Sequence, residues 1–138
     1  MSWNLLIVED DEAIAESLAA ILVARGYHVA TAPNGKAALE LVRTSGVRPD
    51  AVLLDLLMPV MSGFDFLRER EHESLLASVP IIVITAQLSA AQSLSDTDRV
   101  FARILKPLPL ATLLDTVYRA VHGGPPGGAT GRSARRAA

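Results

Sequence analysis

Four apolar runs in this 138-residue chain each end abruptly on a polar residue. The strands of a parallel sheet are buried on both faces, so they form continuous hydrophobic runs and reach water only where a strand ends. If these four strands lie side by side, the polar groups behind them meet at one edge of the sheet. We therefore expect a functional site formed by the endings of runs 5–8, 51–54, 81–84 and 104–105, which are Glu9 with Asp10, Asp55, Thr85 and Lys106.

The length and composition of the chain suit one ordinary domain. Half of the residues are hydrophobic, and a domain of this size buries roughly two thirds of its unfolded surface. The chain has no cysteine, which excludes disulfides and thiolate catalysis and leaves oxygen or histidine ligands for any metal. Acidic residues follow the first short apolar run, so the N-terminus is not a secretory signal. No run approaches the ~18 apolar residues of a membrane span, and we expect a soluble, cytoplasmic protein.

The net charge of −2 conceals an uneven distribution. Residues 123–138 are rich in Gly and Pro and carry three arginines without an acidic residue. The remaining residues hold fifteen acidic and ten basic side chains, a net charge of −5. An acidic domain argues against direct nucleic-acid binding. The basic segment has too little apolar area to offset its ordering entropy, so we expect a disordered tail or linker after a domain at 1–122.

Between the ends, strand-like and helix-like segments alternate without a long loop. Helical spacing of apolar residues predicts helices at 12–25, 36–44, about 64–73 and 110–122, and the segment 87–98, rich in Ser, Ala and Gln, gives the weakest helix pattern. Strands are predicted at 5–8, 27–31, 51–55, 81–84 and 101–105. Five strand–helix units with short connections specify a doubly wound α/β domain. The ligand site of such a sheet lies at the carboxyl ends of its strands.

The polar endings belong to four motifs: VEDD at 8–11, DLLMPVMSG at 55–63, ITA at 84–86 and LKP at 105–107. In this order and spacing they resemble the receiver domain of bacterial two-component response regulators, over about residues 3–122. The resemblance implies a flavodoxin-like (βα)5 fold with a five-stranded parallel sheet in the order 2-1-3-4-5. It also implies a phosphorylation-controlled switch rather than an enzyme, with only weak self-phosphorylation and self-dephosphorylation.

The chemistry of the polar endings agrees with this resemblance. A carboxylate is a competent nucleophile toward a phosphoryl group, and we expect Asp55 to be the phosphoacceptor. Clustered carboxylates repel one another unless a cation joins them, and an oxygen-only site for a phosphate substrate suits Mg²⁺. We expect Asp10 and Asp55 to bind Mg²⁺ directly and Glu9 to act through water, and the resemblance adds the Leu57 carbonyl as a ligand.

Two further motif residues suit contacts with a phosphoryl group. Lys106 can balance its charge, and the Thr85 hydroxyl can donate to one of its oxygens. Ala86, being small, leaves room for the group to enter. The resemblance further implies a cis peptide bond before Pro107, which would direct Lys106 into the site.

Other positions depart from the family or stand outside its motifs. Arg103 replaces an aromatic residue that usually takes part in signalling, so Phe101, or Arg103 itself through an ion pair, has to serve instead. Leu57 and Gln87 bear on the lifetime of the phosphorylated state: Leu57 shields the group from water, whereas the Gln87 amide is able to orient a water molecule. Asp11 is expected to cap the helix that follows it, and the three histidines are expected at the surface: His28, His72 and His122.

The leading hypothesis is a phosphoacceptor that receives its group from a histidine kinase or phosphotransfer protein and then changes its surface for an unknown effector protein. One alternative is a receiver-like interaction module that acts without phosphorylation. Another is a Mg²⁺-dependent phosphatase, which is disfavoured because Leu57 stands where a general acid is expected. A homodimer through the fourth helix, fifth strand and fifth helix is also considered, with candidate charges at Asp96, Asp98, Arg99, Asp115 and Arg119.

Overall fold

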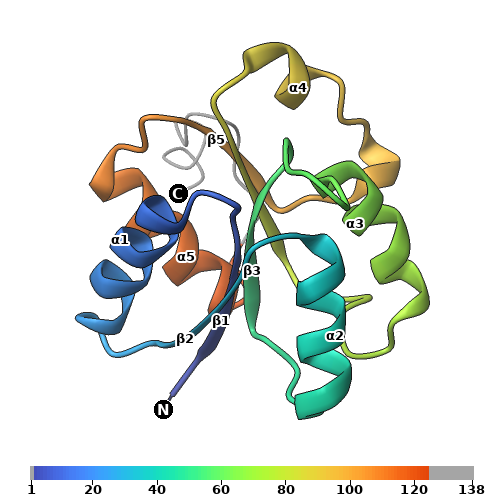
Figure 1. Ribbon diagram of the computed structural model, residues 1–138. Helices are drawn as coiled ribbons and strands as arrows, with labels where there is room; N and C mark the ends of the chain where they lie inside the picture. The colour runs from blue at the N-terminus through green and yellow to red at the C-terminus, as the bar shows by residue number, and fades with distance from the viewer. Residues whose placement is uncertain (1, 125–138) are drawn as a thin grey trace.

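The computed structural model of the protein describes residues 2–124, which form a parallel five-stranded sheet in the order β2-β1-β3-β4-β5 (Figure 1). The strand order confirms the predicted flavodoxin-like fold. Each strand falls within a residue of its predicted bounds, because the buried runs are continuous and end sharply. The strands are β1 (Asn4–Val8), β2 (His28–Ala32), β3 (Ala51–Asp55), β4 (Ile81–Thr85) and β5 (Ala102–Leu105).

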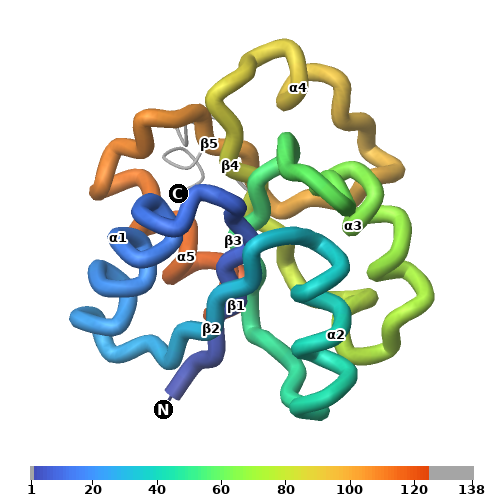
Figure 2. Tube along the Cα trace, viewed as in Figure 1, coloured from blue at the N-terminus to red at the C-terminus, as the bar shows by residue number. Residues whose placement is uncertain are grey.

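Helices cover both faces of the sheet. In Figures 1 and 2, α1 and α5 lie on one side of the sheet, α2 and α3 lie on the other, and α4 lies beyond the carboxyl ends of the strands. This arrangement leaves the carboxyl edge of the central strands open between the loops. The helices are α1 (Glu12–Val23), α2 (Gly35–Ser45), α3 (Gly63–Glu69), α4 (Leu88–Gln92) and α5 (Leu110–Val121).

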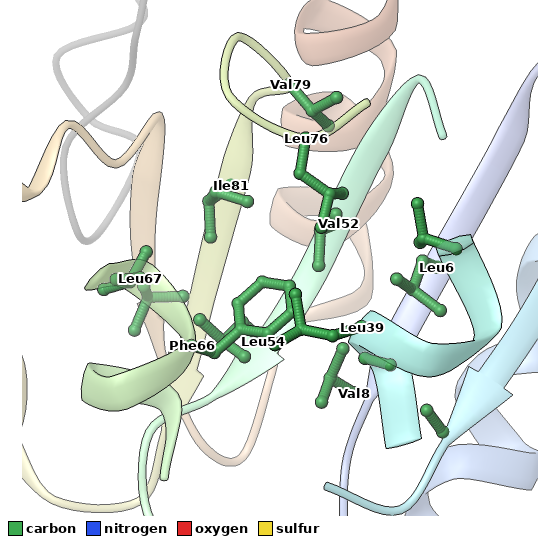
Figure 3. Close-up of a cluster of buried hydrophobic side chains, with 14 of the residues drawn as sticks. Leu6, Val8, Leu39, Val52, Leu54, Phe66, Leu67, Leu76, Val79 and Ile81 are labelled. Atoms are coloured by element: carbon green, nitrogen blue, oxygen red, sulfur yellow. The ribbon is translucent and has the colours of Figure 1, made fainter. Parts of the chain in front are cut away.

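The alternation of side chains along each strand divides the core into two clusters. On one face, Leu54 and Ile81 of the sheet pack with Leu39 of α2 and Phe66 of α3 (Figure 3). On the other face, the sheet packs against α1 and α5 through a second set of buried side chains that includes Ile7, Leu22, Leu53, Ile84 and Val117. Burial on both faces fixes the register of the strands, and the register fixes where their ends lie.

The loops after the strands turn into helices through short side-chain caps. Asp11 accepts a hydrogen bond from the backbone N–H of Ile14, which confirms it as the cap of α1. Ser62 caps α3 in the same way through the N–H of Asp65. These caps end the loops abruptly, so the residues between a strand and its helix have little freedom.

Two helices differ from the sequence-based prediction. The helix predicted at 64–73 is α3 followed by a 3-10 turn, Arg70–His72, because the chain then turns to bury Leu76 and Val79 in the core. The helix expected within 87–98 is the five-residue α4, and a second 3-10 turn, Asp96–Asp98, lies before β5.

The three histidines expected at the surface, His28, His72 and His122, are exposed. The predicted tail lies outside the described residues from position 125 onward. Within residues 2–124, none of the helices has the length and apolar character needed to cross a membrane.

Candidate phosphoacceptor site

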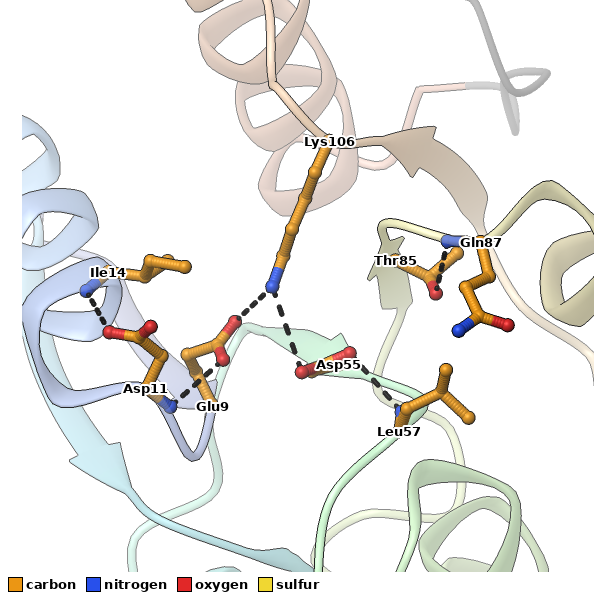
Figure 4. Close-up of polar contacts among 8 residues, drawn as sticks. All are labelled: Glu9, Asp11, Ile14, Asp55, Leu57, Thr85, Gln87 and Lys106. Atoms are coloured by element: carbon orange, nitrogen blue, oxygen red, sulfur yellow. Dashed lines mark hydrogen bonds and ion pairs between the residues drawn. The ribbon is translucent and has the colours of Figure 1, made fainter.

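The polar residues that follow the apolar runs meet at the carboxyl edge of the sheet (Figure 4). The parallel register aligns Val8 with Leu54, Asp55 with Ile84, and Thr85 with Leu105. The residues at and just after the ends of β1, β3, β4 and β5 therefore face one another. The structure brings together Glu9, Asp10, Asp55, Thr85 and Lys106, although they are spread over nearly the whole sequence.

Lys106 joins the two buried carboxylates. Its Nζ donates to Glu9 Oε1 at 2.9 Å and lies 3.7 Å from Asp55 Oδ2. The Lys106–Pro107 peptide bond is cis, as the resemblance implied. Burial lowers the pKa of Lys106, but the hydrogen bond to Glu9 and the charges of the neighbouring carboxylates outweigh it and raise the pKa overall. Lys106 is therefore a fully charged partner of this acidic group.

Asp55 ends β3 with a carboxylate that is only 7% exposed. The backbone N–H of Leu57 donates to Asp55 Oδ1 at 3.2 Å, which leaves Oδ2 on the side of Lys106. Burial, and next the nearby Glu9 carboxylate, raises the pKa of Asp55 to about 6 against the opposing effects of Lys106 and the Leu57 N–H. When Asp55 is ionised, the negative charges of Asp55 and Glu9 together exceed the positive charge of Lys106.

Glu9, Asp10 and Asp55 each offer a carboxylate oxygen, and these three atoms lie within 4.8 Å of one another. Glu9 and Asp55 are buried and Asp10 is exposed. Donors that are all oxygen, gathered this closely, fit a hard divalent cation such as Mg²⁺. The fit is supported by the raised pKa of Asp55, since part of that rise comes from repulsion by Glu9 that a bound cation would relieve.

Thr85 ends β4 beside Asp55, and it is almost fully buried at 1% exposure. Its hydroxyl oxygen accepts a hydrogen bond from the backbone N–H of Gln87 at 3.2 Å (Figure 4). Gln87 and Leu57 are exposed. The Thr85 hydroxyl retains a proton that it is able to donate toward an oxygen arriving above Asp55.

Arg103 lies in β5, opposite Val83 of β4. It is half-buried, and its Nε is buried without a hydrogen-bond partner among residues 2–124. Phe101, the other residue considered for signalling, lies beneath the guanidinium of Arg119, whose Cζ is 5.8 Å from the centre of the ring. The two candidates therefore occupy different environments, and Arg103 is the one that faces the side of the sheet on which Thr85 lies.

Sequence reasoning missed two closely packed residues, one beside Asp55 and one at the opposite ends of β4 and β5. Gly63 packs so closely that a Cβ built on it lies 2.4 Å from the backbone oxygen of Asp55. Arg70 is only 2% exposed and donates to the backbone oxygens of Val79 and Arg99, at 2.7 and 3.0 Å. The Ser62–Gly63 pair at the start of α3 was a usable signal for the close packing of Gly63. The burial of Arg70 had no such signal, because an arginine in a helical pattern predicts an exposed side chain.

Comparison with known families decides the identity of the domain. The sequence profile of the response regulator receiver domain matches residues 5–118. The chain belongs to this family. Response regulator MprA of Mycolicibacterium vanbaalenii is 35% identical over 135 residues, which cover 97% of this chain and 57% of that protein. MprA of Mycobacterium tuberculosis is 36% identical over 115 residues, which cover 83% of this chain and 48% of that protein. This receiver domain thus spans about half the length of these relatives.

Solved structures agree with the family assignment. Chemotaxis protein CheY4 of Vibrio cholerae superposes with a TM-score of 0.78 at 29% identity, covering 87% of this chain and 99% of that structure. Response regulator TrrA of Thermotoga maritima, solved in complex with Mg²⁺ and BeF, gives a TM-score of 0.74 at 28% identity over 86% of this chain and 98% of that one. The receiver domain described here is therefore a component of two-component signalling with the fold of these proteins.

Proposed function

We propose that this receiver domain accepts a phosphoryl group on Asp55 from a histidine kinase or a phosphotransfer protein. The observation that carries the proposal is the environment of the Asp55 carboxylate. One of its oxygens is held by the Leu57 N–H, and the other lies 3.7 Å from the Lys106 ammonium in an otherwise acidic group. A carboxylate fixed in this way, next to a cation, is positioned to attack phosphorus.

The proposed transfer balances in atoms and charge. Asp55 Oδ2 attacks phosphorus while the bond from phosphorus to the donor histidine nitrogen breaks. The nitrogen keeps the electron pair and recovers a proton, and the new phosphorus–oxygen bond makes an aspartyl-phosphate. Lys106 lies on the side of Oδ2, where its positive charge balances part of the negative charge on the phosphoryl oxygens. The Thr85 hydroxyl donates a hydrogen bond to one of these oxygens.

Mg²⁺ is the cofactor that this site would take. Asp10 and Asp55 would hold it directly, Glu9 through water, and the Leu57 backbone carbonyl would complete the protein ligands. When bound, Mg²⁺ supplies positive charge for the carboxylates and for the phosphoryl oxygens. TrrA, whose structure contains Mg²⁺ and BeF, is a relative with the same fold.

Phosphorylation is proposed to act through the surface of the domain. Phosphorylation is expected to change the surface presented to an effector protein, in a cytoplasmic setting, with residues 123–138 acting as a tail or linker after a domain at 1–122. A homodimer through α4, β5 and α5 stays a prediction. Arg119 pairs with Asp115 within α5 at 3.0 Å, and Arg99 pairs with Glu71 at 2.6 Å, so these charges would have to exchange partners in a dimer.

The proposal is tested by incubating the protein with acetyl phosphate and Mg²⁺ and following its intact mass. The phosphorus–oxygen bond to acetate breaks in this reaction, and acetate leaves. We expect a species heavier by one HPO₃ unit in the wild type and no such species in Asp55→Asn or after chelation of Mg²⁺. The single tryptophan, Trp3, precedes β1 at the opposite end of the sheet, so mass reports the transfer more directly than fluorescence. An unmodified wild type would support a module that acts without phosphorylation.

Leu57→Asn is expected to speed the loss of the phosphoryl group by about 100-fold, the lower end of the gain from a positioned polar group. Leu57 is exposed beside Asp55, and its apolar side chain excludes water, whereas an amide there orients an attacking water molecule. A time course of intact mass after removal of acetyl phosphate measures the rate. Val23→Asn, at an exposed apolar position at the end of α1, serves as the matched control, and an unchanged decay in Leu57→Asn would show that Leu57 does not shield the group.

A further inference from the structure

Arg103 is a positive side chain without a counter-charge among residues 2–124. Its Nε is buried without a hydrogen-bond partner, and its guanidinium forms no ion pair with any of residues 2–124. The hydrophobic cluster on this face of the sheet, to which the neighbouring Val83 belongs, offers Arg103 no polar partner. Keeping part of a guanidinium buried and unpaired costs free energy. Such a cost is offset if the domain has a second state in which an anion comes within reach.

The register of the sheet shows where that anion would come from. Arg103 is opposite Val83, and Thr85 lies two residues further along β4, so Arg103 and Thr85 project from the same face. One strand spacing across and two residues along, their Cα atoms are about 8 Å apart, which a long arginine side chain spans. Asp55 lies one strand beyond, opposite Ile84. Arg103 therefore lies next to Thr85, which lies next to Asp55.

Phosphoryl transfer creates a need for one more cation. A carboxylate carries one negative charge, and a phosphoryl group on it brings the total to about −1.5 to −2. A metal ion held by the carboxylates brings the same positive charge before and after transfer, so transfer leaves the site with about one more negative charge than before. Lys106 is already engaged with Glu9 at 2.9 Å and with Asp55 at 3.7 Å. The unpaired guanidinium one strand away is the complementary group.

We propose that Arg103 turns toward the phosphoryl group of phosphorylated Asp55 and supplies a second protein cation beside Lys106. This inference rests on the proposed phosphoacceptor function and deepens it. The guanidinium donates charge-assisted hydrogen bonds to a phosphoryl oxygen in the space next to Thr85. Arg103 stabilises the phosphorylated state in this way and takes no part in breaking or forming the bond to phosphorus.

The movement of Arg103 also couples the site to α4. This helix contacts β4 and β5, and its Ala90 packs against the hydrophobic cluster on the face from which Arg103 projects. It has five residues and no side-chain cap, and so short a helix depends on its packing. Withdrawing the Arg103 side chain from this surface changes the packing beneath α4.

The test measures binding of beryllofluoride, a phosphoryl mimic, in the presence of Mg²⁺. Wild type is compared with Arg103→Gln, which removes the charge, and with Arg103→Lys, which keeps it. Arg25→Gln is the matched control, because it removes an exposed arginine after α1, at the opposite edge of the sheet. We expect Arg103→Gln to bind about tenfold more weakly, the loss of one charge-assisted hydrogen bond, and Arg103→Lys and Arg25→Gln to bind within about threefold of wild type.

A second pair of measurements separates this role from a structural one. Without beryllofluoride, Arg103→Gln should unfold at the same urea concentration as wild type or a higher one, since it removes an unpaired charge. With beryllofluoride, amide exchange in α4 should change in wild type and stay unchanged in Arg103→Gln.

Equal affinities for wild type and Arg103→Gln would overturn the inference, and so would an equal loss in Arg103→Lys and Arg103→Gln. A wild type that neither binds beryllofluoride nor accepts a phosphoryl group would instead overturn the proposed function itself.

Discussion

Gly63→Ala is expected to lower the free energy of unfolding by about 3 kcal/mol and to slow phosphorylation of Asp55 by about 100-fold. A Cβ at this position lies 2.4 Å from the Asp55 oxygen and 2.6 Å from the Leu56 Cα. Both are backbone atoms, so no side chain can rotate away to make room. The end of β3 or the start of α3 has to move, and the carboxylate moves with it. Urea unfolding and the rate of mass increase with acetyl phosphate measure the two effects.

Gly46→Ala provides the control for this substitution. Gly46 ends α2 with a φ of 69°, and a Cβ there has nothing within 4 Å. Its replacement costs about 1 kcal/mol of backbone strain and leaves the site untouched. If both variants phosphorylate at the wild-type rate, close packing of Gly63 does not position Asp55.

Arg70→Ala is expected to lower the free energy of unfolding by about 3–5 kcal/mol. The guanidinium holds the backbone oxygens of Val79, before β4, and Arg99, before β5. Burial, and then the nearby Arg99 charge, lowers the pKa of Arg70, which reflects how completely it is enclosed. Alanine leaves two carbonyls without their partner and a cavity in place of a long side chain. Chemical unfolding with a fitted midpoint and slope measures the loss.

Arg68→Ala is the matched control from the same segment. Arg68 pairs with Asp65 on the surface of α3, with 69% of its side chain exposed, and its removal should change stability by less than about 0.5 kcal/mol. Arg70→Met, which keeps most of the volume but neither hydrogen bond, should fall between the two alanine variants. A midpoint for Arg70→Ala equal to that of Arg68→Ala would mean that the buried arginine does not hold the start of β4 and β5 in place.

The sheet and the positions of the site residues could be predicted from the sequence because both depend on burial. Strands such as β3 and β4 are apolar on both faces and end on Asp55 and Thr85, so their bounds were predicted within one residue. The convergence of these ends follows from parallel pairing alone. Lys106, at the end of a short run, was predicted on the same basis and reaches Glu9 and Asp55.

The remaining features depend on tertiary packing that local sequence does not encode. The chain leaves helical geometry after Glu69 because Leu76 and Val79 are drawn into the core. The helix at 87–98 has few apolar residues, and its length is set by packing on β4 and β5. The burial of Arg70 and the missing partner of Arg103 become visible only when all strands are in place.

In the proposed switch, Asp55 itself carries the phosphoryl group. Treating the domain with acetyl phosphate and Mg²⁺ and then with borohydride reduces an aspartyl-phosphate to homoserine, which peptide sequencing by mass spectrometry locates. We expect homoserine at position 55 in the wild type, at a yield that follows the phosphorylated fraction, and unmodified aspartate at Asp10 and Asp11. Homoserine at one of those positions, or a phosphorylated protein in which Asp55 stays unreduced, would show that Asp55 is not the phosphoacceptor.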